Sequence, residues 1–460
     1  MEVTGSSGRH RAVAAGSGGG RGKRRSVDVG TGGSIRSLGT DLLCIIFALL
    51  DHFDLVRCSV VCKSWNNLIY TSSLMRDLYN KRNPHLKCAS IKSDMLETSM
   101  KIYLEEIAME EHKLSFLRGS VKVDQWSGHH ARVNVCRMKR GLILTGVGDK
   151  VLRLWSAESC NYLDEYVSPE MNQLVDYDFD ENKIVGLTSD RICIWRRHGQ
   201  RGIFQSCKGI FTRGLCMRYI DPEAVIGCED GRVRVFDMYS GRCSRIIRYK
   251  CDQAISMHSI MMHSGPVTCL TLTDDQLVIG GSTFGNIAIA DLSSGKRMGS
   301  VKSCFSPTAG LKCFSFNMHS YSVFAGSTSG YAHCWDLRTL RPVWETRVSP
   351  NVIYTVHHLS NDTSMLAVGG IDGVLRILNQ STGEILSSLV IDAANGVPLS
   401  SKNSHEVVQK KVRRLQDTTC LDIIPRYLRP PITCLAVGMN KIVTTHNEKF
   451  IRAWRFHMNN

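Results

Sequence analysis

Residues 142–155 have the sequence LILTGVGDKVLRLW, and this stretch indicates the fold class most clearly. An apolar run leads into a Gly/Asp turn, and alternating apolar residues then end at Trp155, a pattern that predicts a β-hairpin. The pattern returns six times, at residues 183–195, 223–236, 276–290, 322–335, 365–378 and 441–454. Successive copies end 40, 41, 54, 45, 43 and 76 residues apart. The chain is therefore a seven-fold β repeat with two insertions.

The repeat resembles the WD-repeat β-propeller family, whose four-stranded blades are about 40–45 residues long. Trp335-Asp336 is a literal Trp-Asp signature, and Phe236-Asp237 and Ala290-Asp291 are weakened versions of it. The resemblance implies an all-β, seven-bladed propeller over residues 120–457. It also implies a structural hydrogen-bond set within a blade, without a catalytic role. The first copy supplies this set as His129, Thr145, Asp149 and Trp155, whereas the last copy has Thr444 and Trp454 but Glu448 in place of Asp.

Closure of the ring can be predicted from the two ends of the repeat region. The last copy supplies three strands before the chain stops, and an unassigned alternating strand, residues 120–126, precedes the first copy. We expect this strand to complete the last blade, because closure removes two sheet edges that would otherwise invite aggregation.

Residues 34–80 predict a small all-α module. Leu42, Leu43, Ile46, Phe47 and Leu50 recur at helical spacing behind Asp41, a possible N-cap, and Asp54 is placed to cap a second helix. Further apolar positions lead to Trp65 and Ile69 in a third helix. A core this small is marginal, so its wide apolar stripe is expected to be a docking surface.

This module resembles an F-box, with one departure: Leu38-Gly39 stands where the family has Leu-Pro. The resemblance implies docking onto the Skp-type adaptor of a cullin-based ubiquitin ligase. The adaptor-binding positions that it implies are Leu38, Leu42, Ile46, Leu50, Leu55, Val61 and Trp65. The alternative is an ordinary three-helix packing unit for the downstream domain.

Two segments flank the module. Residues 1–33 hold ten Gly and six Lys or Arg against Glu2 and Asp28, so we expect a disordered basic tail. Lys23-Arg24-Arg25 within it is a weak nuclear address, and a transit peptide is a third interpretation. Residues 81–119 mix apolar residues with Lys and Glu and lack Gly until Gly119, which predicts a helical linker with a solvated face.

The insertions and the arginines bear on substrate binding. Both insertions follow the last strand of a blade and should share a face with the Gly/Asp turns. The larger one, residues 393–430, predicts either a short basic amphipathic helix around Val408 and Val412 or a surface loop. Arg132 and Arg213 each precede an Asp by 17 residues, and Arg429 lies near the equivalent point of the last blade. Some F-box propellers bind phosphorylated substrates through such arginines, so these three are candidate substrate-binding residues; solvated surface arginines are the alternative.

Composition excludes several classes of protein. The 18 cysteines include no Cys-x-x-Cys pair, which argues against a disulfide framework or a closed zinc site. The apolar run Leu42 to Leu50 is nine residues long, whereas a membrane span needs about 20. No secretory signal, nucleophile arrangement, phosphate loop or metal set is evident. We therefore expect a non-catalytic protein without cofactors, in the cytoplasm or nucleus.

Three functions compete at this stage. The first is a substrate-recruiting subunit of a Skp-cullin-F-box ubiquitin ligase, whose propeller binds an acidic or phosphorylated protein. The second is a WD-repeat scaffold without ligase function. The third, a nucleic-acid binder, is suggested by the net charge of +15. It is disfavoured because the basic residues are spread and are not interleaved with aromatic ones.

Overall fold

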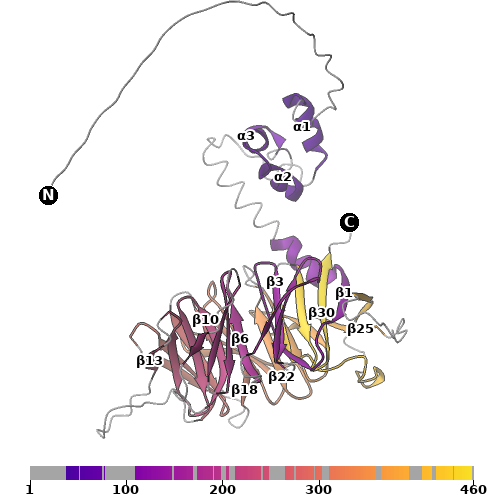
Figure 1. Ribbon diagram of the computed structural model, residues 1–460. Coiled ribbons are helices and arrows are strands. Elements are labelled where there is room, and N and C mark those ends of the chain that lie inside the picture. Colours follow the sequence, from indigo (N-terminus) through magenta and orange to yellow (C-terminus); the bar gives the residue numbers. More distant parts are fainter. Residues whose placement is uncertain are drawn as a thin grey trace, which may run out of the picture. The chain divides into compact units, whose positions relative to one another are not determined.

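The computed structural model divides into an amino-terminal unit up to Leu104 and a carboxy-terminal unit from Glu105 onward (Figure 1). The structure describes residues 38–50, 52–74, 77, 109–147, 150–168, 173–189, 191–197, 204–206, 213–239, 242–247, 265–273, 276–294, 296–302, 310–358, 364–392, 407–416, 421–438 and 440–457. The predicted tail and most of the predicted linker lie outside these residues.

The amino-terminal unit has three short helices: α1 (Thr40–Ala48), α2 (His52–Ser59) and α3 (Lys63–Thr71). They enclose a small core of Leu43, Phe47, Leu55, Ile69 and Leu74. The predicted N-caps Asp41 and Asp54 are wrong, because both residues lie inside their helices. Gly39 holds the N-cap position of α1 without a side-chain hydrogen bond, while the two acids lie in the first turns of α1 and α2. A carboxylate there still interacts favourably with the helix dipole.

The carboxy-terminal unit contains seven antiparallel sheets, which we call blades 1 to 7 in chain order. The strands of blades 1 to 3 are β2 (Val133–Lys139), β3 (Leu142–Val147), β4 (Val151–Ser156) and β5 (Tyr162–Val167); β6 (Leu174–Phe179), β7 (Lys183–Thr188), β8 (Ile192–Arg196) and β9 (Phe204–Ser206); and β10 (Gly214–Ile220), β11 (Glu223–Cys228), β12 (Val233–Asp237) and β13 (Arg242–Ile247).

Those of blades 4 to 6 are β14 (Val267–Leu272), β15 (Leu277–Ser282), β16 (Asn286–Asp291) and β17 (Arg297–Lys302); β18 (Leu311–Asn317), β19 (Ser322–Ser327), β20 (Tyr331–Asp336) and β21 (Arg341–Arg347); and β22 (Ile353–His358), β23 (Met365–Gly370), β24 (Leu375–Asn379) and β25 (Ile385–Ile391). Blade 7 contains β28 (Cys434–Val437), β29 (Lys441–Thr445), β30 (Phe450–His457) and β1 (Ser120–Ser127). The seven-bladed fold predicted from the repeat is confirmed.

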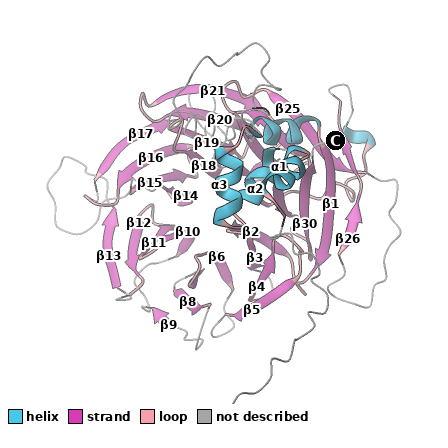
Figure 2. Cartoon of the chain, turned by 90° about the horizontal axis from the view of Figure 1, so that it is seen from above, coloured by secondary structure: helices cyan, strands magenta, loops and turns pink. Residues whose placement is uncertain are grey.

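The ring is closed by a strand from the start of the repeat region. β1 pairs antiparallel with β30 along its whole length, from Ser120 opposite His457 to Ser127 opposite Phe450. The first strand of each blade lies innermost, so that β2, β6, β10, β14 and β18 surround the centre of the ring in Figure 2. Strands are thus hydrogen-bonded within each blade. Blade 7 combines three strands from the end of the repeat region with one strand from its start, and this pairing closes the ring.

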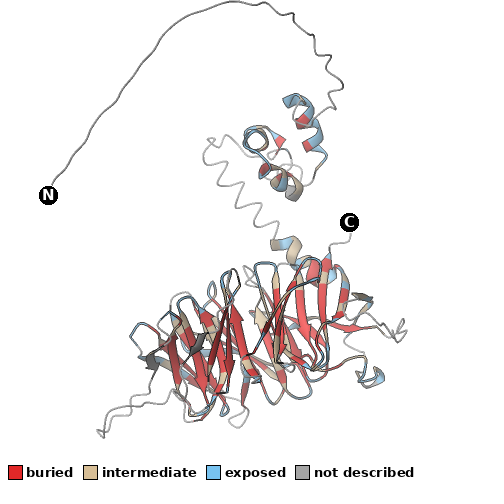
Figure 3. Cartoon of the chain, viewed as in Figure 1, coloured by how far each residue is buried: buried red, intermediate tan, exposed pale blue. Residues whose placement is uncertain are grey.

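The core of the propeller lies between the blades. Seven clusters of buried apolar side chains fill the seven interfaces between neighbouring blades. Buried residues run through the strands of the ring in Figure 3, whereas turns at both ends are exposed. Alternate residues of each strand therefore face one neighbouring blade or the other.

The larger insertion forms extended structure at the seam between blades 6 and 7. β26 (Val408–Lys410) pairs with β1 of blade 7, and β27 (Val412–Arg414) pairs with β25 of blade 6. We call residues 408–414 the strap. The predicted amphipathic helix is wrong here, because the outer edges of β1 and β25 offer unpaired backbone groups that an extended segment satisfies. A single short 3₁₀ turn, η4 (Leu421–Ile423), follows among the described residues of the insertion.

Residues 109–118 form a helix that leads into β1. Its Phe116 is fully buried and stacks on Phe456 of β30, with 4.0 Å between ring centroids. Arg414 of the strap donates to the carbonyls of Phe116 and Gly119, at 3.0 and 2.9 Å. The predicted linker therefore ends as a helix docked on the propeller, and only part of its surface is solvated.

Candidate functional site

The three-helix unit exposes a continuous apolar stripe along α1. Leu42, Ile45, Ile46 and Leu49 recur at helical spacing on its outer face, and the exposed fraction of Leu49 reaches 84%. Val60 and Val61, between α2 and α3, add two further exposed apolar side chains. Soluble surfaces rarely leave such residues together without a partner, so this face is suited to docking.

The structure separates the predicted adaptor-binding residues into three groups by their exposure. Leu42, Ile46 and Val61 are exposed and available to a partner. Leu55 is 0% exposed and belongs to the core of the unit, so its assignment as a contact residue is wrong. The motif gives the position of Leu55 in the sequence, but it does not show that the side chain faces the core from α2.

Leu38, Leu50 and Trp65 are only partly buried and pack against the same core. The indole of Trp65 meets the ring of Phe47 edge-on, with 5.2 Å between centroids. These three residues support the docking face from behind and keep only part of their surface for a partner. Sequence reasoning missed Ile45, Leu49 and Val60, although the first two continue the helical spacing from Leu42.

The predicted substrate-binding arginines have different environments. Arg132 and Arg213 lie immediately before the inner strands β2 and β10, and both are exposed. Arg213 Nη1 lies 3.8 Å from Glu229 Oε1 at a similarly exposed site. Both side chains are therefore accessible at the ends of inner strands in different blades.

Arg429 differs from these two. Its Nε donates to the carbonyl of Ile424 at 2.9 Å, and Nη1 donates to the carbonyl of Asp372 at 3.2 Å. The side chain is partly buried and connects the insertion to a turn of blade 6. Its proximity in sequence to the equivalent repeat position therefore does not give it an equivalent role.

The predicted blade set is present in blade 1 as far as the described residues reach. His129 Nε2 lies 2.9 Å from Thr145 Oγ1, and Trp155 Nε1 donates to the same oxygen at 2.7 Å. Asp149 lies outside the described residues. Blade 7 builds the same bridge differently: His446 lies 2.8 Å from Thr444 Oγ1, which accepts from Trp454 Nε1 at 2.9 Å. All these groups are buried, as expected for a structural set.

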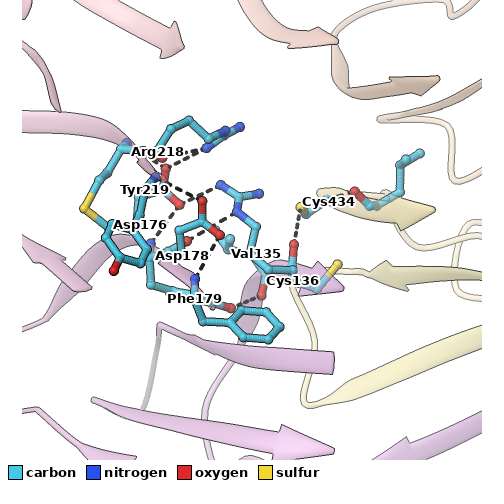
Figure 4. Close-up of polar contacts among 12 residues, drawn as sticks. Val135, Cys136, Asp176, Asp178, Phe179, Arg218, Tyr219 and Cys434 are labelled. Carbon is cyan, nitrogen blue, oxygen red and sulfur yellow. Dashed lines mark hydrogen bonds and ion pairs between the residues drawn. The ribbon is translucent and has the colours of Figure 1, made fainter. Parts of the chain in front are cut away.

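A charged cluster on the inner strands was not anticipated from the sequence (Figure 4). Arg137 Nη2 of β2 donates to Asp176 Oδ1 of β6 at 2.8 Å, and the other oxygen of Asp176 accepts from the backbone N–H of Met217 in β10 at 3.0 Å. Asp178 repeats the arrangement: it lies 2.6 Å from Lys139 Nζ and accepts from the backbone N–H of Tyr219 at 3.1 Å. The two carboxylates thus join three neighbouring blades.

The cluster holds ionised carboxylates beside basic side chains on the inner strands of the ring. Burial acts to raise the pKa of Asp178, but Lys139, Arg137 and Arg218 outweigh it and hold that pKa below its ordinary value. A cavity of about 350 Å³ opens beside the cluster, lined among others by Arg137, Arg218 and His358. Burial lowers the pKa of His358 to about 3, so this imidazole is neutral at physiological pH. The geometry favours a structural cluster over a proton-transfer site.

Comparison with known proteins covers both units. An F-box-like family model matches residues 35–81, the three-helix unit. An F-box/WD-40 repeat-containing protein of Arabidopsis thaliana is 43% identical over 446 residues, which cover 92% of this chain and 95% of that protein. The similarity therefore extends over the helices and the propeller alike.

Proposed function

Because this chain belongs to the F-box/WD-40 repeat proteins, we propose that it is the substrate-recruiting subunit of a Skp-cullin-F-box ubiquitin ligase. In this proposal the three-helix unit binds a Skp-type adaptor, and the adaptor brings the cullin. The propeller binds the substrate protein. Ubiquitin transfer is carried out by the partners, and this chain acts by raising the effective concentration of a substrate lysine near them.

The exposed stripe of α1 is the observation that carries the proposal. Among the described residues of the unit, the core holds five buried apolar side chains, while Leu42, Ile45, Ile46 and Leu49 are left facing solvent. Burying such a side chain contributes about 1.5–3 kcal/mol, so a partner that covers the stripe gains binding energy and relieves an unfavourable exposure.

The proposed substrate is a protein with an acidic or phosphorylated segment. Arg132 and Arg213 support this part, because both guanidinium groups are exposed at the ends of inner strands. A guanidinium is suited to bidentate contacts with carboxylate or phosphate oxygens. Arg429 is not carried forward, because two of its nitrogens already donate to backbone carbonyls.

The cytoplasm or nucleus is the proposed location. Among the residues that the structure describes, none of the helices has the length and apolar character that a membrane crossing requires. The proposal includes no cofactor and no covalent chemistry on this chain.

Direct binding to a purified Skp-type adaptor tests the proposal. Replacing Leu42 and Ile46 together by Lys should weaken binding at least about 100-fold, because each change loses roughly 1.4 kcal/mol or more of buried apolar contact. The matched control is Ser64→Lys together with Asn67→Lys, which adds the same two positive charges at exposed positions of α3. Circular dichroism would verify that all variants remain folded. Equal affinities of the double variant and the wild type would favour a WD-repeat scaffold without ligase function.

A further inference from the structure

An arginine recurs at the same position of the third strand in several blades. In blade 7 this arginine lacks the ion pair that its counterparts form. Arg234 of β12 and Arg376 of β24 are each preceded by an aspartate four residues earlier, and the pairs meet at 2.7 and 2.6 Å. Arg452 of β30 occupies the same place in blade 7. The acid four residues before it, Glu448, is exposed and does not form an ion pair with it.

Arg452 is nevertheless as buried as its counterparts, with 5% of its surface exposed. Its Nε donates to Gln125 Oε1 at 3.0 Å, and its guanidinium lies 4.7 Å from the centroid of the Phe450 ring. No carboxylate of the described part of the chain lies within ion-pair distance. Burial accordingly lowers the pKa of Arg452 to about 9. A buried cation without an anion is unfavourable by several kcal/mol in general.

Arg452 lines a cavity of about 590 Å³ between β1, β30 and the strap. Lys122 of β1 and Lys410 and Lys411 of the strap share its wall, and Asp392 is the single acid among the described lining residues. Asp392 makes no ion pair with any of these cations in the described structure. The cavity therefore carries a surplus of three positive charges.

Apart from Gln125 and Gln409, the rest of the wall is apolar or aromatic. Val121, Ile391, Val412 and Leu428 line the cavity, and Tyr427, which is largely exposed, stands at its wall as well. The volume lies within the usual range of ligand sites, about 300–1,000 Å³. A small inorganic anion would satisfy the cations but leave the apolar wall uncovered. The matching ligand joins an oxyanion to apolar groups, as a peptide segment does.

We propose that this cavity, formed where the strap joins blades 6 and 7, binds an oxyanion-bearing side chain of a substrate peptide, with Arg452 as its principal contact. The oxyanion is a carboxylate or a phosphate, and neighbouring apolar side chains of the peptide cover the apolar wall. The inference rests on the proposed function of the propeller as the substrate-binding domain. It adds a contact with the substrate at the strap, separate from the contacts proposed for the exposed arginines before β2 and β10.

Thermal unfolding of the full-length protein tests the unpaired charge. Arg452→Met keeps an unbranched apolar stem and removes the cation, so its melting temperature in chloride buffer should exceed that of the wild type. Two controls should lower the melting temperature: Arg376→Met leaves the buried Asp372 without its ion-pair partner, and Arg234→Met removes the closer of the two arginines paired with the half-buried Asp230. A melting temperature of Arg452→Met below that of the wild type, in line with the two controls, would contradict the absence of an anion partner.

Peptide binding tests the ligand. The probes are three fluorescent peptide mixtures with degenerate flanks and a central phosphoserine, glutamate or serine, measured by anisotropy at constant ionic strength. We expect the wild type to bind a mixture with an acidic centre at least tenfold more tightly than the serine mixture. Arg452→Met should abolish this difference, Arg452→Lys should reduce it, and Arg376→Met should preserve it. Preference for phosphoserine alone identifies a phosphate site, whereas equal preference for glutamate identifies a site for either oxyanion.

Two outcomes would overturn the inference. One is an acidic preference that persists in Arg452→Met, which would place recognition elsewhere on the propeller. The other is saturable stabilisation by inorganic phosphate without discrimination among the peptides, which would make the cavity a site for a free anion. Adaptor binding by the same Arg452→Met preparation should equal that of the wild type. If the wild type itself does not bind the adaptor, the proposed function is contradicted, whatever the result with the peptides.

Discussion

Removal of the Trp126 side chain should destabilise the whole propeller, because this residue joins its two ends. Trp126 lies on β1, the strand that completes blade 7, and its side chain packs between blades 7 and 1. Only 1% of it is exposed, and its indole meets that of Trp155 edge-on at 5.9 Å. Truncation of so large a buried ring to Ala typically lowers the free energy of unfolding by about 3–5 kcal/mol.

Chemical denaturation followed by circular dichroism would measure this loss. Trp126→Phe should be milder than Trp126→Ala, because it keeps an aromatic ring and removes a buried indole N–H that has no hydrogen-bond partner in the described structure. Ser127→Ala is the control on the same strand. Its side chain is exposed, so it should change stability by no more than about 0.5 kcal/mol.

Deletion of residues 120–126 extends the test from one side chain to the strand. It would leave the outer edge of β30 unpaired, and such edges promote association. We expect aggregation or unfolding in size-exclusion chromatography. The reasoning on ring closure would be refuted if the deleted chain stayed monomeric, or if Trp126→Ala unfolded within about 1 kcal/mol of the wild type.

Three further predictions concern single side chains. Leu55→Ala should destabilise the three-helix unit by about 2–5 kcal/mol, as measured by thermal unfolding, whereas Leu49→Ala should leave its stability unchanged and weaken adaptor binding. Thr444→Val removes the oxygen shared by His446 and Trp454, so it should lower stability by about 1–3 kcal/mol in urea denaturation; an unchanged midpoint would contradict the shared bridge. The carboxyl of Asp178 has a lowered pKa in the folded protein, so its stabilising effect is present above the pKa of an unfolded Asp, about 3.9, and is lost as the pH falls toward its folded value. The stability difference between wild type and Asp178→Asn should therefore be largest at neutral pH and shrink below about pH 4; a constant difference would argue against the ion pair.

The propeller could be predicted from sequence because its information is local and repeated. Each hairpin has its own turn residues and its own alternation of apolar side chains, as in residues 142–155. Because the pattern recurs about every 40 residues, each copy supports the assignment of the others. The strap was misread because Val408 and Val412 fit a helical spacing as well as two short strands. The free edges of β1 and β25 decided between them, and those edges exist only in the folded ring.

The candidate sites were less predictable, because side-chain direction and pairing depend on neighbouring elements. Leu55 fits an adaptor contact by motif, but the packing of α2 buries it. Arg429 lies near a repeat position, but nearby carbonyls hold its guanidinium. One signal was available and unused: Arg137 and Asp176 are 39 residues apart, close to one repeat length, which places them on adjacent inner strands.

The proposed role in a ubiquitin ligase can be tested by affinity purification of the full-length protein from cells after proteasome inhibition, followed by quantitative mass spectrometry. We expect the wild type to recover a Skp-type adaptor, a cullin and a set of further proteins bound by the propeller. Replacing Leu42 and Ile46 by Lys should remove the adaptor and the cullin, keep the further proteins, and raise the cellular level of at least one of them. Recovery of the adaptor and cullin by the variant at the level of the wild type, or their absence from both, would show that this chain does not recruit substrates to such a ligase through α1.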